Sequence, residues 1–171
     1  MAAQRQVVSP IGPLLLTASP LGLTGLALPG ARPSIETSPP DPAAEAVLDG
    51  AAAQLSEYFA GGRREFDLPL DIAAAAFQTR VWRTIAAIPF GETASYGAVA
   101  ARAGAPLAYR AAGAACGAHP VALVVPGHRV IAADGGLHGY GGGLEMKRWL
   151  LEHEGLRLDG ATVRRPALLA V

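Results

Sequence analysis

Two helical segments joined by a short turn constrain the fold of this chain more than any other feature. Residues 93–103 and 107–118 both have helical composition, and Gly104-Ala105-Pro106 separates them. A glycine-containing turn of this length joins the two helices of a helix-turn-helix, whose second helix meets the groove of a nucleic acid. The sequence therefore predicts a helix-turn-helix in the C-terminal half.

The second of these helical segments consists mostly of small residues. They are Ala108, Ala111, Ala112, Gly113, Ala114, Ala115, Gly117 and Ala118. A helix with so few side-chain atoms can approach another surface very closely. The composition alone leaves two interpretations open, a face that fits a narrow groove and tight packing inside a core.

The charges are divided unevenly along a chain whose net charge is zero. Residues 1–75 carry four arginines and eight acids, whereas residues 76–171 carry ten Lys and Arg and six acids, a surplus of four positive charges. Such asymmetry indicates that the C-terminal half faces a polyanion, although two small domains can also differ this much by chance.

The composition also excludes several classes of protein. No window of about 18 apolar residues without charge occurs, so we expect no membrane span. The first residues meet polar side chains and Pro10 before a signal-peptide core can develop, which favours a cytoplasmic protein. The single Cys116 can form neither an internal disulfide nor a thiolate zinc cluster. We expect a monomer.

The N-terminal half reads as strands followed by a helix. Glycine and proline divide residues 7–18 and 21–28 into short strands, which predicts an antiparallel hairpin or meander. Residues 29–42 contain several prolines and predict an exposed linker. Asp41 as N-cap and Pro42 in the first turn begin an amphipathic helix that runs to about residue 59. Residues 66–70 alternate and predict an edge strand.

The C-terminal half predicts further helices and short strands. Apolar spacing indicates a helix over 77–88 and a final helix from Leu144 to His153, with Met146, Trp149, Leu150 and Leu151 facing inward. Between these helices, residues 121–125 predict a short buried strand and residues 130–132 a second one, with a turn at 126–128.

Six separated blocks of this half resemble one family, the O6-alkylguanine-DNA alkyltransferases, also called methylated-DNA-protein-cysteine methyltransferases, in the same order and spacing. The blocks are Phe77-Gln78-x-x-Val81-Trp82, Ile88-Pro89-Phe90-Gly91-Glu92-Thr93-x-Ser95-Tyr96, Arg110-Ala111-x-Gly113, Val124-Val125-Pro126-x-His128-Arg129-Val130-Ile131, Gly139-Tyr140-x-Gly142-Gly143 and Lys147-x-Trp149-Leu150-Leu151-x-His153-Glu154-Gly155. Ser9-Pro10-Ile11-Gly12 and the helix around 54–59 resemble the family's N-terminal domain. The resemblance therefore spans nearly the whole chain.

The resemblance implies an α+β fold with two domains. An N-terminal α/β domain, ribonuclease-H-like, is expected over residues 1–75, and a C-terminal winged helix-turn-helix-like domain, with the DNA-binding surface and the alkylguanine pocket, over 76–171. The family uses no cofactor, and this chain lacks the cysteines of the zinc site found in some members. The implied partner is double-stranded DNA that carries O6-alkylguanine.

The resemblance also implies roles for the DNA-contacting residues. Arg110 would enter the duplex and replace the extruded base, and Tyr96 would push against the target phosphate. Extrusion is needed because the O6 atom of guanine lies inside the base stack. The remaining implied DNA contacts are Ala111, Gly113, Ala114 and Arg129.

Within the pocket, the resemblance implies that His128 and Glu154 deprotonate an acceptor thiol through a bridging water. Tyr140, Gly141 and Gly142 would form the wall and lid around the flipped base. Cys116, His119 and Val130 would complete the lining. His119 stands where the family carries an asparagine.

The chain departs from the family at the acceptor itself. Gly127 stands where the family has the cysteine that takes the alkyl group, and glycine has no nucleophile. The leading hypothesis is that the protein recognises O6-alkylguanine by base flipping without transfer to this position, in a pocket with slightly more room, and marks the damage for downstream repair proteins. Whether Gly127 is native or an engineered replacement stays open.

Two alternatives accompany this hypothesis. In the first, Cys116 is a relocated acceptor, which keeps the protein an active alkyltransferase. In the second, the fold binds a small ligand or a metal cofactor through Cys116, His119 and His128, although two or three such donors fall short of a structural zinc set.

Overall fold

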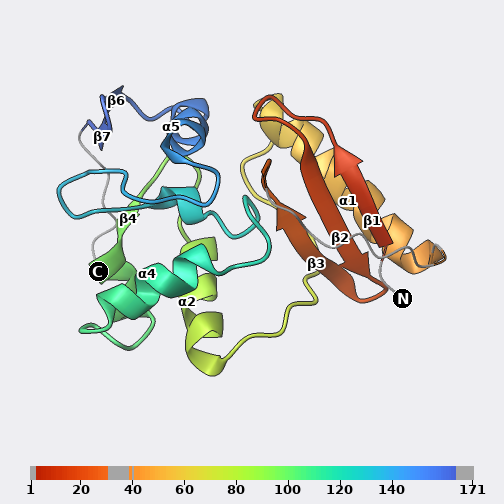
Figure 1. Ribbon diagram of the computed structural model, residues 1–171, viewed down its shortest axis with the longest axis horizontal. Helices are drawn as coiled ribbons and strands as arrows, with labels where there is room; N and C mark the ends of the chain where they lie inside the picture. The colour runs from red at the N-terminus through yellow and green to blue at the C-terminus, as the bar shows by residue number, and fades with distance from the viewer. Residues whose placement is uncertain (1–2, 31–38, 40, 165–171) are drawn as a thin grey trace. The chain divides into compact units, whose positions relative to one another are not determined.

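The chain divides into two compact units in the computed structural model, which describes residues 3–30, 39 and 41–164 (Figure 1). The first unit comprises residues 1–73 and 120–122, and the second comprises residues 74–119 and 123–171. Most of the predicted linker over 29–42 lies outside the described residues.

The first unit contains a three-stranded antiparallel meander. Strands β1 (Ala3–Val7), β2 (Leu14–Ser19) and β3 (Gly22–Ala27) lie in the order β1-β2-β3. In β2 every second residue is fully buried, as expected for a strand with one face on a core. The structure confirms the predicted meander.

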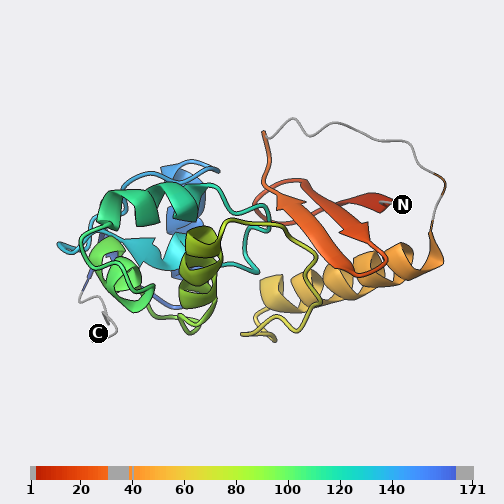
Figure 2. The same ribbon diagram turned by 90° about the horizontal axis from the view of Figure 1, so that it is seen from below.

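Helix α1 (Pro42–Phe59) runs along one face of this sheet (Figure 2). One Asp41 carboxylate oxygen accepts hydrogen bonds from the backbone N–H groups of Ala43 at 2.9 Å and Ala44 at 3.4 Å, so Asp41 is the predicted N-cap. The apolar stripe Leu48, Ala51, Leu55 and Tyr58 is fully buried. Burial of this stripe against the sheet stabilises the helix.

Two predicted strands are wrong because the structure forms only isolated bridges in these segments. In segment 66–70 only Leu70 forms a bridge, to Leu23. Pro69 has no N–H to extend this ladder, although its carbonyl accepts from the Leu23 N–H at 2.8 Å. In segment 121–125 Val121 bridges to Leu26, and Leu123 then leaves the extended conformation with φ at 67°. Leu70 and Val121 therefore pair with β3 only through isolated bridges.

The second unit begins with three helices that pack on one another. They are α2 (Ala76–Ala86), α3 (Tyr96–Arg102) and α4 (Tyr109–Gly117). The Trp82 indole N–H of α2 donates to the Ala115 carbonyl of α4 at 2.8 Å. The Ser95 hydroxyl caps α3 by accepting from the Ala98 N–H at 3.1 Å. The predicted helix 93–103 starts later than expected because Ala94 and Ser95 form a strand.

That strand, β4 (Ala94–Ser95), pairs in parallel with β5 (Val130–Ile131). A 3-10 turn, Gly127–Arg129, leads directly into β5, and helix α5 (Leu144–His153) follows later in the chain. The hairpin β6 (Leu158–Asp159) and β7 (Thr162–Val163) closes a small core with Ile131, Leu137 and Leu151.

Helix α5 has the predicted bounds but a different inward face. Its buried residues are Lys147, Leu150 and Leu151, whereas Met146 and Trp149 are only partly buried. Among the described residues, no helix combines the length and apolarity needed to cross a membrane.

Candidate functional site

Glu154, the residue that ends α5, accepts hydrogen bonds from several donors in the interior of the second unit. His128 Nε2 lies 2.7 Å from one carboxylate oxygen, and the Gly91 N–H lies 3.2 Å from the other. Arg129 donates to both oxygens, from Nε at 2.8 Å and Nη2 at 2.9 Å. Gly91 has a φ of 77°, and a Cβ there would lie 3.0 Å from the Glu154 carbonyl oxygen, so glycine suits this approach.

This arrangement fixes the protonation states of the two partners. Burial alone raises the pKa of Glu154, but the hydrogen bonds and charges of His128 and Arg129 outweigh it and hold the pKa well below its usual range. Burial lowers the pKa of His128 despite the hydrogen bond to Glu154, so the ring is neutral at neutral pH. Because a carboxylate only accepts, His128 Nε2 carries the proton and Nδ1 keeps a lone pair.

Gly127 begins the turn that carries His128. Its backbone φ lies outside the left-handed region, so the conformation itself does not demand glycine. A Cβ built on Gly127 would lie 2.7 Å from His119 Nε2 and 3.4 Å from Cys116 Sγ. The prediction that the missing side chain leaves extra room is therefore wrong, because the His119 imidazole lies in that space.

The two residues facing Gly127 are both uncharged. Burial, and then the nearby His128, lowers the pKa of His119 to about 4. Burial raises the pKa of Cys116 to about 11, although Lys147 opposes the shift. Cys116 as a whole residue is 8% exposed, and its Sγ lies 3.8 Å from the Gly127 carbonyl oxygen. Cys116 is therefore a thiol, not a thiolate, at neutral pH.

Lys147 belongs to this site, although the sequence pattern predicted no role for it. The side chain is fully buried, and Nζ donates to the carbonyls of Val130 at 2.7 Å and Leu137 at 2.6 Å. Burial lowers its pKa to about 8. Its spacing of three and four residues from the buried Leu150 and Leu151 is the signal that could have placed it inward.

Two tyrosines lie near these residues. The rings of Tyr140 and His128 meet edge to face with centroids 6.5 Å apart, and burial raises the pKa of Tyr140. Tyr96 is half-buried, with Lys147 Nζ 6.0 Å from the centre of its ring. Of the predicted lid, Gly141 is exposed and Gly142 partly buried.

Four buried polar atoms of this unit have no hydrogen-bond partner among the described residues. They are Thr93 Oγ1, His119 Nδ1, His128 Nδ1 and the Tyr140 hydroxyl. Buried polar groups without a partner are uncommon in proteins and mark places where water or a ligand binds. Three of the four belong to residues that were predicted to line the site.

The outer face of α4 is bare. Arg110, Ala111 and Ala114 are exposed, Gly113 is partly buried, and Ala112, Ala115 and Cys116 face the interior. The structure therefore confirms core packing for one face of this helix, and the fit of its exposed face to a groove stays a prediction. A Cβ on Gly113 would make an ordinary 3.6 Å contact with Tyr96 Cδ1, which places Tyr96 beside this helix.

Two family models match the chain. The model described as "6-O-methylguanine DNA methyltransferase, ribonuclease-like domain" matches residues 6–72, and the one described as "6-O-methylguanine DNA methyltransferase, DNA binding domain" matches residues 76–156. The chain belongs to the 6-O-methylguanine DNA methyltransferase family. The α+β fold with these two domains is the predicted one.

Relatives in this methyltransferase family match the chain over most of its length. The "Methylated-DNA--protein-cysteine methyltransferase" of Mycobacterium bovis is 49% identical over 156 residues, which are 90% of this chain and 93% of that protein. The protein of the same name from Methanosarcina acetivorans is 42% identical over 147 residues, 86% of this chain and 94% of its own.

A solved structure from this family agrees with the fold described above. The crystal structure of Mycobacterium tuberculosis OGT in complex with DNA superposes with a TM-score of 0.80 and 48% identity, covering 88% of this chain and 91% of that chain.

One residue of the family pattern is placed differently from the prediction. Arg129 was predicted to contact DNA, but its side chain is 6% exposed. Besides Glu154, it binds the Ile88 carbonyl through Nη1 at 2.6 Å. The buried ion pair does not support a direct DNA contact, since an exposed Arg129 would leave the buried Glu154 carboxylate without its cation.

The structure does not favour the alternative in which Cys116, His119 and His128 hold a metal cofactor. Within residues 3–30, 39 and 41–164, no group of three or more His, Cys, Asp or Glu side chains is placed to hold a metal ion. Burial leaves both His119 and Cys116 uncharged at neutral pH.

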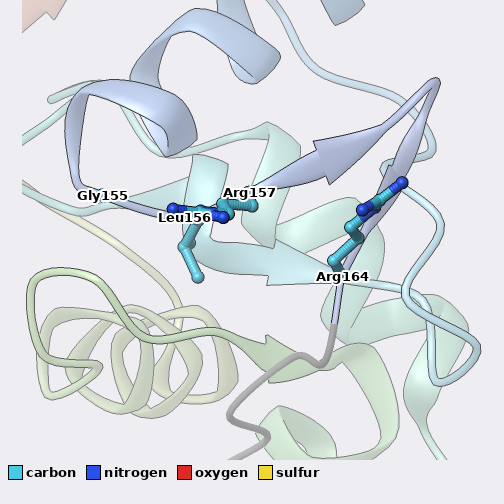
Figure 3. Close-up of a pocket in the computed structure, with 4 residues that line it drawn as sticks. All are labelled: Gly155, Leu156, Arg157 and Arg164. Atoms are coloured by element: carbon cyan, nitrogen blue, oxygen red, sulfur yellow. The ribbon is translucent and has the colours of Figure 1, made fainter.

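A separate open recess lies at the C-terminal hairpin, lined by Gly155, Leu156, Arg157 and Arg164 (Figure 3). The Arg164 N–H donates to the Arg157 carbonyl at 2.7 Å, which holds the two segments together. Arg164 also pairs with Asp159 at 3.1 Å on the surface. None of the predicted functional residues lines this recess.

Proposed function

We propose that this chain binds O6-alkylguanine in double-stranded DNA, with the damaged base extruded, and does not transfer the alkyl group to a side chain at position 127. The observation that carries the proposal is the Gly127–His128–Glu154 arrangement. The buried histidine and carboxylate are hydrogen-bonded at 2.7 Å, while the residue beside them has no side chain. Relatives are named for transfer to a cysteine, and the resemblance of the Pro126-x-His128-Arg129 motif predicts that Gly127 stands at that position.

The bare face of α4 supports binding to DNA. Arg110 is exposed at its first turn, and Ala111 and Ala114 follow on the exposed side. Small side chains let the backbone of a helix approach a narrow groove, and an arginine can take the place of an extruded base. The related OGT was crystallised with DNA.

The unpaired polar groups support binding of a base in the interior. His128 Nδ1 presents a lone pair, and the Tyr140 hydroxyl can donate or accept. A purine carries several donors and acceptors on its edge, so an extruded guanine offers these groups the partners they lack. Since no thiolate reacts with the base, the complex would persist and mark the damage for downstream repair proteins.

Two measurements test this function. Fluorescence anisotropy should show tighter binding to a duplex with one O6-methylguanine than to the same duplex with guanine. Incubation with a duplex carrying a radioactive methyl group should leave the protein unlabelled. Equal affinity for the two duplexes refutes damage recognition, and stoichiometric labelling refutes binding without transfer.

A second candidate function, transfer to Cys116, is favoured by one distance. Cys116 Sγ lies 3.4 Å from the place of a Cβ on Gly127, so the thiol borders the expected acceptor position. The raised pKa of about 11 opposes this function, because the thiolate is the nucleophile. Fragment mass spectrometry after incubation with the methylated duplex decides between them. A methyl group on Cys116, lost in Cys116→Ser, would establish the relocated acceptor.

A further inference from the structure

We propose that the His119 imidazole occupies the place of the absent side chain at position 127, so that His119 bounds the alkyl-group site and keeps a larger residue out of position 127. The two positions then form one coupled pair, eight residues apart in the chain. The part of this inference that concerns alkyl groups rests on the proposed function. The packing part does not.

The distances carry the packing argument. A Cβ on Gly127 would meet His119 at 2.7 Å from Nε2 and 3.4 Å from Cδ2. Real Cβ atoms essentially never approach another heavy atom within 3.0 Å. Even the single methyl group of an alanine therefore requires the imidazole to move.

The two glycines of α4 do not share this crowding. A Cβ on Gly113 would make an ordinary 3.6 Å contact, and one on Gly117 would meet nothing within 4 Å. Only at Gly127 among these three does a side-chain ring stand where a Cβ would be. The φ of Gly127 is unremarkable, so the obstacle is the neighbour and not the backbone.

The chain on both sides of His119 limits how its backbone can shift away from Gly127. His119 follows the C-cap of α4, Ala118, and precedes Pro120, whose ring restricts the backbone of the residue before it. Its Nδ1 is fully buried, and the ring is neutral because burial, with the nearby His128, lowers its pKa to about 4. A neutral ring can pack against Gly127 and Cys116, whereas a charged one would be costly there.

The consequence for a bound base is chemical as well as steric. An O6-alkyl group that points toward position 127 meets an uncharged imidazole nitrogen, where the family has a thiol. His119 thereby limits the size of the substituent that fits. Restoring a cysteine at position 127 alone does not restore the space that a thiol and an alkyl group need together.

A thermal double-mutant cycle tests the packing without DNA. Gly127→Ala should lower Tm by about 5 °C, since overpacking a buried site typically has an effect of this order. In the His119→Asn background, where the ring is gone, the same substitution should leave Tm unchanged or raise it. The matched control is Gly117→Ala, which enters open space. Equal effects of Gly127→Ala in both backgrounds overturn the proposal.

A second experiment adds the nucleophile. Gly127→Cys and the double variant Gly127→Cys/His119→Asn are each incubated with the methylated duplex, and transfer is followed over time. The double variant should react at least ~10-fold faster, a difference of about 1.4 kcal/mol in the barrier. Equal rates overturn the proposal. If neither variant prefers the methylated duplex in a binding assay, the proposed function fails, while the thermal cycle still decides the packing.

Discussion

Arg129 holds Glu154 with two hydrogen bonds, from Nε at 2.8 Å and from Nη2 at 2.9 Å, and both side chains are buried. A third donor, Nη1, binds the Ile88 carbonyl at 2.6 Å. Since Glu154 ends α5 and His128 binds the same carboxylate, the guanidinium ties the turn at 127–129 to that helix. The position of His128 therefore depends on its neighbour in the chain.

Replacing Arg129 with alanine should lower the free energy of unfolding by about 3–5 kcal/mol, because the buried Glu154 carboxylate loses its cation. Urea denaturation measures this change. The matched control is Arg148→Ala, which removes an exposed arginine paired with Glu152 at 3.1 Å and should change stability by less than about 1 kcal/mol. Similar losses in the two variants would contradict the burial of Arg129.

Stability should fall between pH 6.5 and pH 4 through His119. Its pKa is about 4 in the folded chain and about 6.5 in an unfolded one. As the pH falls through this window, the unfolded state binds a proton that the folded state does not bind. The contribution of neutral His119 to the free energy of unfolding is therefore complete above pH 6.5 and is lost toward pH 4.

His119→Asn should flatten the pH profile of stability in that window, as measured by urea denaturation at half-unit intervals. The control is His138→Asn, because His138 is exposed and has a φ of 54°, a conformation that asparagine tolerates. A profile unchanged by His119→Asn would show that the folded chain does not disfavour the charged form of His119.

Replacing Lys147 with methionine should destabilise the chain by about 2–4 kcal/mol. The substitution preserves much of the side-chain length but leaves the carbonyls of Val130 and Leu137 without the donor that binds them at 2.7 and 2.6 Å, and each buried unpaired acceptor costs about 1–3 kcal/mol. Arg148→Met, on the exposed side of the same helix, is the control. Equal stability of Lys147→Met and the parent protein would refute the buried double hydrogen bond.

Arg110→Ala should weaken binding to the O6-methylguanine duplex by about 10-fold or more, because a base-replacing side chain is lost together with one positive charge. Arg110 is exposed, so Tm should be unchanged. The control is Arg83→Ala, which removes the same charge from an exposed position on α2. It should weaken DNA binding less, because only one long-range attraction to the phosphates is lost. If both variants bind alike, Arg110 has no special role.

Ala114→Leu should abolish tight DNA binding without loss of stability. Ala114 lies on the exposed face of α4, and a leucine there would hold the helix away from a groove. Ala86→Leu, at an exposed position near the end of α2, is the control for added apolar surface. Anisotropy and thermal melts measure both effects. Unimpaired binding of Ala114→Leu would exclude this face as the DNA surface.

The sequence alone determined the local elements whose signals are contained within one segment. Asp41 and Pro42 begin α1, and the apolar stripe beyond them sets its buried face. The spaced blocks of the C-terminal half were sufficient to predict the family and the α+β fold. Capping and helical periodicity can be read from the sequence because they act between residues close together in the chain.

Only the tertiary structure decided which side chains meet across the chain. Contacts between distant segments set the inward positions of Arg129 and Lys147 and the place of the His119 ring beside Gly127. They also decide that isolated bridges replace two expected strands. Burial and pairing are properties of the assembled core, where a neighbour from another segment can fill a space or satisfy a charge. Composition and spacing along one segment do not specify that neighbour.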